Sequence, residues 1–103
     1  MKSMADQKAS RWKHPGGKLR RMGPSALSER ELLAIILGSG TNGKSALKIS
    51  DEILDTYANL RGLMGVPLKE LMKIKGLKEV KATKIAAMYE ASRRILKHIE
   101  NDT

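Results

Sequence analysis

The sequence of 103 residues predicts a single all-α domain of about five helices, preceded by a flexible basic arm. Three observations favour this fold class. Apolar residues recur three and four positions apart in the long segments between the glycines. No segment shows the strict alternation of apolar and polar residues that a half-buried strand requires. Prolines and glycines interrupt the periodic segments where helices are expected to end.

The basic arm is predicted to span residues 1–17, because this segment has no apolar period and ends in Pro-Gly-Gly. Trp12 lies within it, where a base or a partner could stack on its ring. The folded domain is expected to span residues 18–100. It opens with a short helical turn, "KLRRM", which Gly23 and Pro24 end.

The next two helices are predicted to form the centre of the domain. In "SERELLAIIL", Ser28 and Glu31 have the spacing of a capping box, and five large aliphatic residues cover so much of the helix that it should be buried. Gly38 is well placed to end this helix. The segment "SALKISDEILDTYA" has apolar residues at helical spacing and acidic residues on the other side. It therefore predicts an amphipathic helix packed on the first.

Three further helical segments are predicted in the last part of the chain. "NLRGLM" forms a short connection, and "PLKELMKI" forms a helix with Pro67 at its first position. The final helix runs through "EVKATKIAAMYEASRRILKHI". Its apolar line, from Ile85 through Tyr89 and Ile95 to Ile99, keeps the helical period for about five turns.

Charge and composition limit the possible functions. Twenty Lys and Arg stand against eleven Asp and Glu, a net charge of +9, and the excess is concentrated in residues 1–21 and 69–84. Clustered positive charge points to a polyanion, most often nucleic acid, although a lysine-rich face that only confers solubility is the alternative. The lack of cysteine excludes disulfides and thiolate metal sites, and it favours a cytoplasmic location. No apolar stretch predicts a membrane span or a signal peptide.

Residues 38–45, "GSGTNGKS", match the phosphate-loop pattern G-x-x-x-x-G-K-[ST] in full. A phosphate loop needs a strand before it and a parallel sheet around it, and the chain predicts no strands, so neither nucleotide hydrolysis nor a cofactor is expected. The unpaired N–H groups and the dipole of a helix that starts after such a turn also suit a DNA phosphate. The residues predicted to bind DNA at this first turn are Gly38, Gly40, Gly43, Lys44 and Ser45.

The same design recurs in "LMKIKGLKEVKATKI". This segment resembles the helix-hairpin-helix motif, in which a Gly-apolar-Gly turn presents backbone amides to DNA phosphate. The resemblance implies that Leu77 packs into the core. It also places Lys78 where the motif has its second glycine, so that a side chain there either obstructs the phosphate or adds a charge contact. The DNA-binding residues implied at this second turn are Lys75, Gly76, Leu77, Lys78, Lys81 and Lys84. For the lysines, a solvated helix face is an equal alternative.

Two longer segments, "KLRRMGPSALSERELLAIILGSGTNGKSALKISDEIL" and "LRGLMGVPLKELMKIKGLKEVKATKI", resemble the N-terminal domain of the RadC-like family, designated UPF0758 and named for DNA repair. The resemblance covers about residues 18–97. It implies a tandem helix-hairpin-helix fold and association with DNA. Family members continue into a C-terminal domain similar to zinc isopeptidases, which implies a metallopeptidase-like partner domain in a longer protein. Here His14 and His98 are isolated, so neither a metal site nor an enzyme is expected.

The sequence therefore predicts a non-catalytic module that contacts DNA backbone phosphates with little sequence preference, with a role in DNA repair implied by the resemblance. The alternative is a docking module for another protein, in which Leu60, Leu63 and Met64 are exposed for the partner. A steep fall in affinity with salt would favour the DNA-binding interpretation. The oligomeric state is left open.

Overall fold

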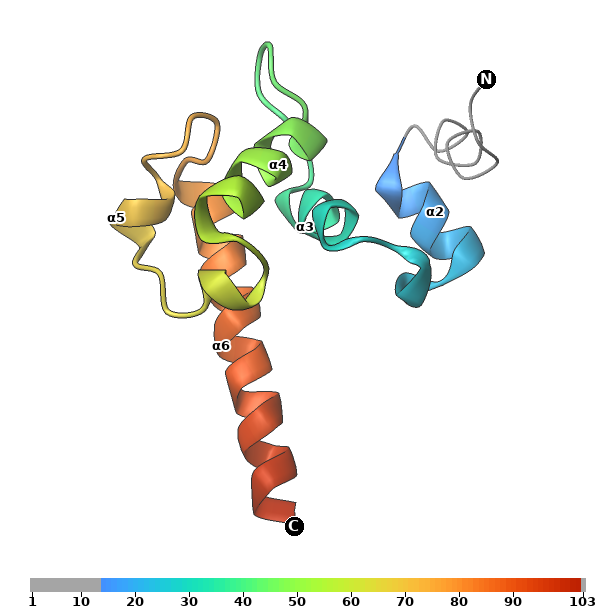
Figure 1. The fold of residues 1–103 in the computed structure, drawn as a ribbon, viewed down its shortest axis with the longest axis vertical. Coiled ribbons are helices and arrows are strands. Elements are labelled where there is room, and N and C mark those ends of the chain that lie inside the picture. Colours follow the sequence, from blue (N-terminus) through green and yellow to red (C-terminus); the bar gives the residue numbers. More distant parts are fainter. Residues whose placement is uncertain (1–13, 103) are drawn as a thin grey trace.

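The computed structural model describes residues 14–102, and this part of the chain is built from helices (Figure 1). The elements in chain order are α2 (Pro15–Met22), the 3₁₀ turn η1 (Pro24–Ala26), α3 (Glu29–Leu37), α4 (Ala46–Tyr57), the 3₁₀ turn η2 (Arg61–Leu63), α5 (Leu68–Leu71) and α6 (Glu79–Asp102). The only extended pairing among the described residues is an isolated bridge between Thr41 and Lys44. The predicted all-α class is therefore confirmed. Most of the predicted arm, with Trp12, lies outside the described residues.

Helix α2 begins three residues before the predicted helical turn. Pro15 occupies its first turn, where the fixed φ of proline suits a helix and its missing N–H is not needed. The Pro-Gly-Gly sequence that predicted a break therefore starts the helix instead. Helix α2 has no buried residue, and it is attached to α3 by an ion pair in which Lys18 Nζ lies 3.0 Å from Glu31 Oε1.

The start of α3 is the predicted capping box. The Ser28 hydroxyl accepts a hydrogen bond from the Glu31 N–H, and the Glu31 carboxylate accepts one from the Ser28 N–H. Burial raises the pKa of Glu31, but the hydrogen bonds from Ser28 and Lys18 and the charge of Lys18 together lower it below its ordinary value. The carboxylate is therefore ionised in the folded protein at neutral pH, and it joins the cap of α3 to α2.

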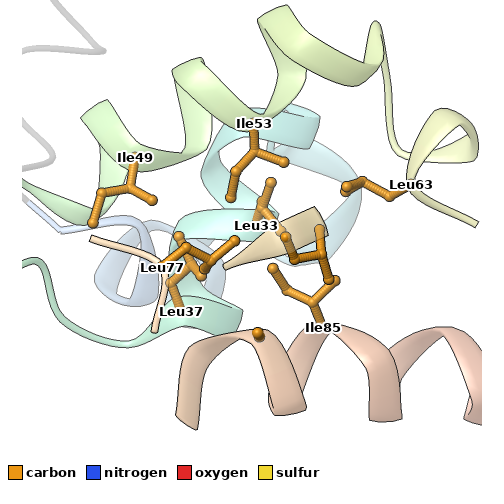
Figure 2. Packing of buried hydrophobic residues seen from close by; sticks show 9 residues of the cluster. Leu33, Leu37, Ile49, Ile53, Leu63, Leu77 and Ile85 are labelled. Atoms are coloured by element: carbon orange, nitrogen blue, oxygen red, sulfur yellow. The ribbon is translucent and has the colours of Figure 1, made fainter. Parts of the chain in front are cut away.

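Side chains from every later helix meet in one core (Figure 2). Leu33 and Leu37 of α3 face Ile49 and Ile53 of α4, and Ile85 of α6 closes the cluster from the other side. The buried members are Leu33, Leu37, Ile49, Ile53, Leu63, Leu71, Leu77, Ala82 and Ile85. Truncating a buried leucine or isoleucine to alanine typically costs about 2–5 kcal/mol, so these few contacts determine whether the domain folds.

The segment before α6 is held by buried side chains more than by helical hydrogen bonds. Helix α5 is a single turn that ends at Leu71, three residues earlier than predicted. The chain then continues in turns, with the Ile74 N–H donating to the Leu71 carbonyl and the Leu77 N–H donating to the Ile74 carbonyl. Leu71 and Leu77 are both fully buried. Placing both in the core requires the chain to turn between them, which ends the helix.

The backbone of Leu60 fastens the connection between α4 and η2 to the rest of the fold. Its N–H donates to Glu29 Oε1 of α3 at 2.7 Å, and its carbonyl accepts a hydrogen bond from the Tyr89 hydroxyl of α6. Burial, with the charge of Glu29, raises the pKa of Tyr89. The phenol therefore stays protonated and remains a donor.

Helix α6 has two halves with different surroundings. Ala82 and Ile85 are buried in the core and Tyr89 packs against it, whereas every residue from 91 to 102 is exposed. Figure 1 shows this outer half extending away from the other helices. The predicted apolar line is present, but its end is not core. None of the described helices is long and apolar enough to cross a membrane.

Candidate nucleic-acid interface

The first predicted DNA-binding turn, between α3 and α4, is closed on itself. The Thr41 N–H donates to the Lys44 carbonyl at 2.8 Å, and the Lys44 N–H donates to the Thr41 carbonyl at 3.0 Å. Glycine is required at position 40, because the backbone passes close to the Lys44 backbone there. A β-carbon built on Gly40 would lie 2.2 Å from the Lys44 carbonyl oxygen. Two amides that a phosphate loop would turn toward its ligand are thus paired within the turn.

Lys44 points into the fold and joins the two predicted turns. Its Nζ lies 2.6 Å from Glu52 Oε2 and donates to the Lys75 carbonyl at 3.2 Å, and its side chain is only 14% exposed. The charge of Lys44 is therefore already paired with a carboxylate of α4. Its hydrogen bond fixes the chain at Lys75, where the second turn begins.

The second turn, between α5 and α6, packs against both the first turn and α4. Gly76 has a φ of 93°, and a β-carbon built there would lie 3.0 Å from Ile49 Cδ1 and 3.2 Å from Thr41 Oγ1. Leu77 is fully buried, as the sequence predicted. Glycine at position 76 is thus required both by the backbone conformation and by the close approach of α4.

Lys78 occupies the place of the motif's second glycine without backbone strain. Among the described residues other than glycine, only Ala58 has a positive φ, so the conformation at Lys78 is one that any residue adopts. The Lys78 side chain is exposed at the start of α6. A lysine here therefore adds charge to the surface of the turn without requiring a left-handed backbone.

Four lysines gather around the second turn and the first two turns of α6: Lys75, Lys78, Lys81 and Lys84. Within residues 14–102 none of them forms an ion pair with a carboxylate. Lys75, Lys78 and Lys84 are exposed. Lys81 is half-buried, because it lies one turn from the buried Ile85 on the same side of α6, so it does not belong to a fully solvated helix face.

Lys84 lies beside the end of α3. A β-carbon built on Gly38, the residue that caps α3, would stand 3.5 Å from Lys84 Nζ. The unpaired carbonyl groups and the negative end of the helix dipole favour a cation at this position. Lys84 therefore stabilises the packing of α6 on α3 as well as contributing charge.

The remaining predicted residues of the first turn are open to solvent. Gly38, Gly43 and Ser45 are exposed, and the Ser45 hydroxyl accepts the Lys48 N–H as the cap of α4. An open cleft of about 690 Å³ lies next to Gly38 and Ser45, between α2 and the facing ends of α3 and α4. His14 and Arg20 line this cleft, and no sequence motif indicated a role for either residue there. The positive charge of residues 1–21 was the signal available for Arg20.

The residues proposed for the docking alternative do not form one exposed surface. Leu63 belongs to the core and is 1% exposed, Leu60 is half-buried, and only Met64 is open to solvent. Leu63 is buried because η2 turns it into the core, which the short segment around it did not reveal. This part of the docking interpretation is therefore wrong.

The family model and the curated relatives that match this chain belong to one family. Residues 7–83 match the model of the family described as UPF0758 N-terminal. The chain is 42% identical over 82 residues to a UPF0758 protein of Polaromonas sp., and 41% identical over 80 residues to relatives in Bordetella petrii and Carboxydothermus hydrogenoformans. These matches cover 80%, 78% and 78% of this chain, but only 37%, 36% and 35% of the relatives. No solved structure is significantly similar.

Proposed function

The chain belongs to the UPF0758 family, and from this premise we propose that it is a DNA-binding module that holds backbone phosphates at the turn between α5 and α6. The observation that carries the proposal is the group of four lysines at this turn, none of which is paired with a carboxylate in the described part of the chain. A polyanion would remove their mutual repulsion. The net charge of +9 favours its approach.

The chemistry proposed is binding to phosphate oxygens without base contacts. The first N–H groups of α6 have no partner within the helix, and the positive end of its dipole lies at the same place. Lys75 and Lys78 are the exposed cations closest to this helix start along the chain. Lys44 acts as a positioning residue, because it holds the Lys75 carbonyl. Contacts of this kind fix a protein on DNA but carry no sequence information.

The wider role is also a proposal. The two turns, held side by side by Lys44, support a tandem helix-hairpin-helix arrangement, and the family resemblance supports a part in DNA repair. The lack of cysteine favours a cytoplasmic location. The chain spans less than two-fifths of the length of the relatives described above. We assign no catalytic step to it. In a longer protein, catalysis is expected from the metallopeptidase-like domain that the resemblance implies.

The test is a titration of labelled duplex and single-stranded DNA at salt concentrations between about 50 and 200 mM, followed by fluorescence anisotropy. In the double variant Lys75→Gln with Lys78→Gln, both side chains are exposed, so folding should change by less than about 1 kcal/mol. We expect weaker binding to every duplex sequence. The slope of log affinity against log salt should fall by about 0.9 for each phosphate that the variant no longer neutralises.

The matched control removes the same charge from the outer half of α6, in Arg93→Gln with Lys97→Gln. Both residues are exposed and lie far along α6 from the turn. Equal weakening by the two double variants would show that binding depends on net charge alone, and the lysines would then be a solvated face. Absence of binding by the unmodified chain at the lowest salt concentration would refute the proposal altogether.

A further inference from the structure

The outer half of α6 carries an apolar face that no other described element covers. Ile95, Leu96 and Ile99 are 58%, 53% and 56% exposed. Single exposed aliphatic residues are common on protein surfaces, but three on one side of two successive turns form a continuous patch. Figure 1 shows that this half of the helix projects beyond the core, so its apolar face is accessible along its whole length.

The spacing of this face is that of a helix-pairing seam. Positions 85, 88, 92, 95 and 99 alternate in steps of three and four, and they carry Ile, Met, Ser, Ile and Ile. The first of these residues is buried in the core of its own chain, whereas the last three are exposed. The seam therefore begins inside the domain and continues along the outer half of α6. No other helix of the described chain packs against this outer part of the seam.

Three charged residues of this half, Glu90, Arg93 and Arg94, stand away from the seam and pair with one another within the helix. Glu90 Oε2 lies 2.8 Å from Arg93 Nη2 and 2.8 Å from Arg94 Nε. These hydrogen bonds, that of Arg93 first, lower the pKa of Glu90 to about 2, so its carboxylate stays ionised. Positions that flank the seam carry Ala91, Leu96 and His98 instead of lysine or glutamate. A second copy of the same helix therefore meets no like charge across the seam.

We propose that two copies of this chain pair through the outer halves of α6, side by side and antiparallel. In this register residue 88 of each copy lies opposite residue 99 of the other, and residue 92 lies opposite residue 95. The antiparallel direction follows from charge. Each chain carries +9. In this register residue 85 of one copy lies opposite residue 102 of the other, so the two copies of Ile85 are 17 residues apart along the paired helices. At 1.5 Å per residue this is about 26 Å, well beyond the Debye length of about 8–10 Å. Parallel helices would bring the two cores together.

The interface is small and the dimer is of the weak, concentration-dependent class. About three turns of each helix take part, which places the buried area at the low end for specific protein interfaces, below about 1,200 Å². Pairing therefore becomes measurable at high protein concentration. It requires neither DNA nor a further domain, so its test is independent of the function proposed above.

Sedimentation equilibrium of the chain without DNA, from about 5 to 500 µM, tests the pairing. We expect the apparent mass to rise from 11.4 kDa toward twice that value. The variant Ile95→Gln with Ile99→Gln should stay monomeric, and its melting temperature at low concentration should match that of the unmodified chain, because both side chains are more than half exposed. The control Arg94→Gln with Lys97→Gln, on the charged side, should still dimerise. A monomer throughout, or dimerisation of the Ile95→Gln, Ile99→Gln variant, would overturn the proposal.

Disulfide trapping tests the direction, since the chain has no cysteine of its own. We expect chains with Met88→Cys to cross-link to chains with Ile99→Cys under mild oxidation at high concentration. Ile99→Cys alone should not cross-link, because the two copies of residue 99 lie far apart in the antiparallel pair. Efficient homodimer formation by Ile99→Cys would show that the helices are parallel and would refute the antiparallel arrangement.

Discussion

Replacing Gly76 with alanine tests how tightly the second turn packs against α4. A φ of 93° costs a residue with a β-carbon roughly 1–2 kcal/mol. The new β-carbon would lie 3.0 Å from Ile49 Cδ1, and Ile49 is fully buried, so crowding adds roughly 1–3 kcal/mol. The sum is about 2–5 kcal/mol. At about 4–8 °C per kcal/mol for a domain of this size, the melting temperature should fall by at least about 8 °C.

The matched control is Gly65→Ala. Gly65 has a φ of 76°, but a β-carbon built there meets no atom within 4 Å, so only the backbone cost of roughly 1–2 kcal/mol applies. Urea unfolding followed by circular dichroism gives the free energy of unfolding for both variants. We expect Gly76→Ala to lose at least about 1 kcal/mol more than Gly65→Ala, the lower end of the crowding cost. Equal losses would refute the close contact between the turn and Ile49.

Two further variants test single carboxylates. Glu79 is the only acid between Lys75 and Lys84, and its charge would repel a phosphate bound there. Glu79→Gln should therefore raise the affinity for duplex DNA by up to about fivefold. This corresponds to the free energy of about 0.2–1 kcal/mol that is typical of an exposed charge pair. Unchanged affinity in an anisotropy titration would contradict a phosphate contact beside Glu79. The pKa of Glu31 is lower in the folded state than its ordinary value of 4.5. The ionised carboxylate therefore stabilises the fold at pH values above 4.5, and this stabilisation is lost as the pH falls through the lower pKa of the folded state. Melting temperatures from about pH 7 to about pH 3 should therefore fall more steeply for the unmodified chain than for Glu31→Gln, and parallel curves would contradict this ion pair.

The parts of the fold that could be predicted are those set by local sequence. Ser28 and Glu31 lie three residues apart and form the cap of α3 in the way their spacing indicated. The start of α2 and the end of α5 were misplaced because their signals are ambiguous or distant. Pro-Gly-Gly begins a helix as readily as it ends one, and α5 stops at Leu71 because Leu77 has to reach the core. Periodicity in α6 located the helix but gave no information on what covers its apolar side.

The residue types of the candidate site could be predicted from the sequence, but most of their contacts could not. The lysines and glycines of the second turn were visible in the sequence, and the burial of Leu77 followed from the motif. The contact between Lys44 and Lys75 could not be predicted, because the two residues are 31 positions apart in the sequence. Only the folded chain brings the Lys75 carbonyl to the Lys44 side chain. The phosphate-loop string, which the lack of predicted strands excluded as a nucleotide site, did not indicate this role either. Its lysine is paired with Glu52 and connects two turns of the fold.

The division of α6 into a packed half and an exposed half has a consequence for how the domain opens. Backbone amides near Ile85 exchange their hydrogens only when the core itself opens, whereas those beyond residue 91 exchange whenever the free end of the helix frays. One continuous helix thus belongs to two units of different local stability. Pairing with a second copy would join the outer unit to the cooperative core, so the length of α6 that resists exchange would depend on protein concentration.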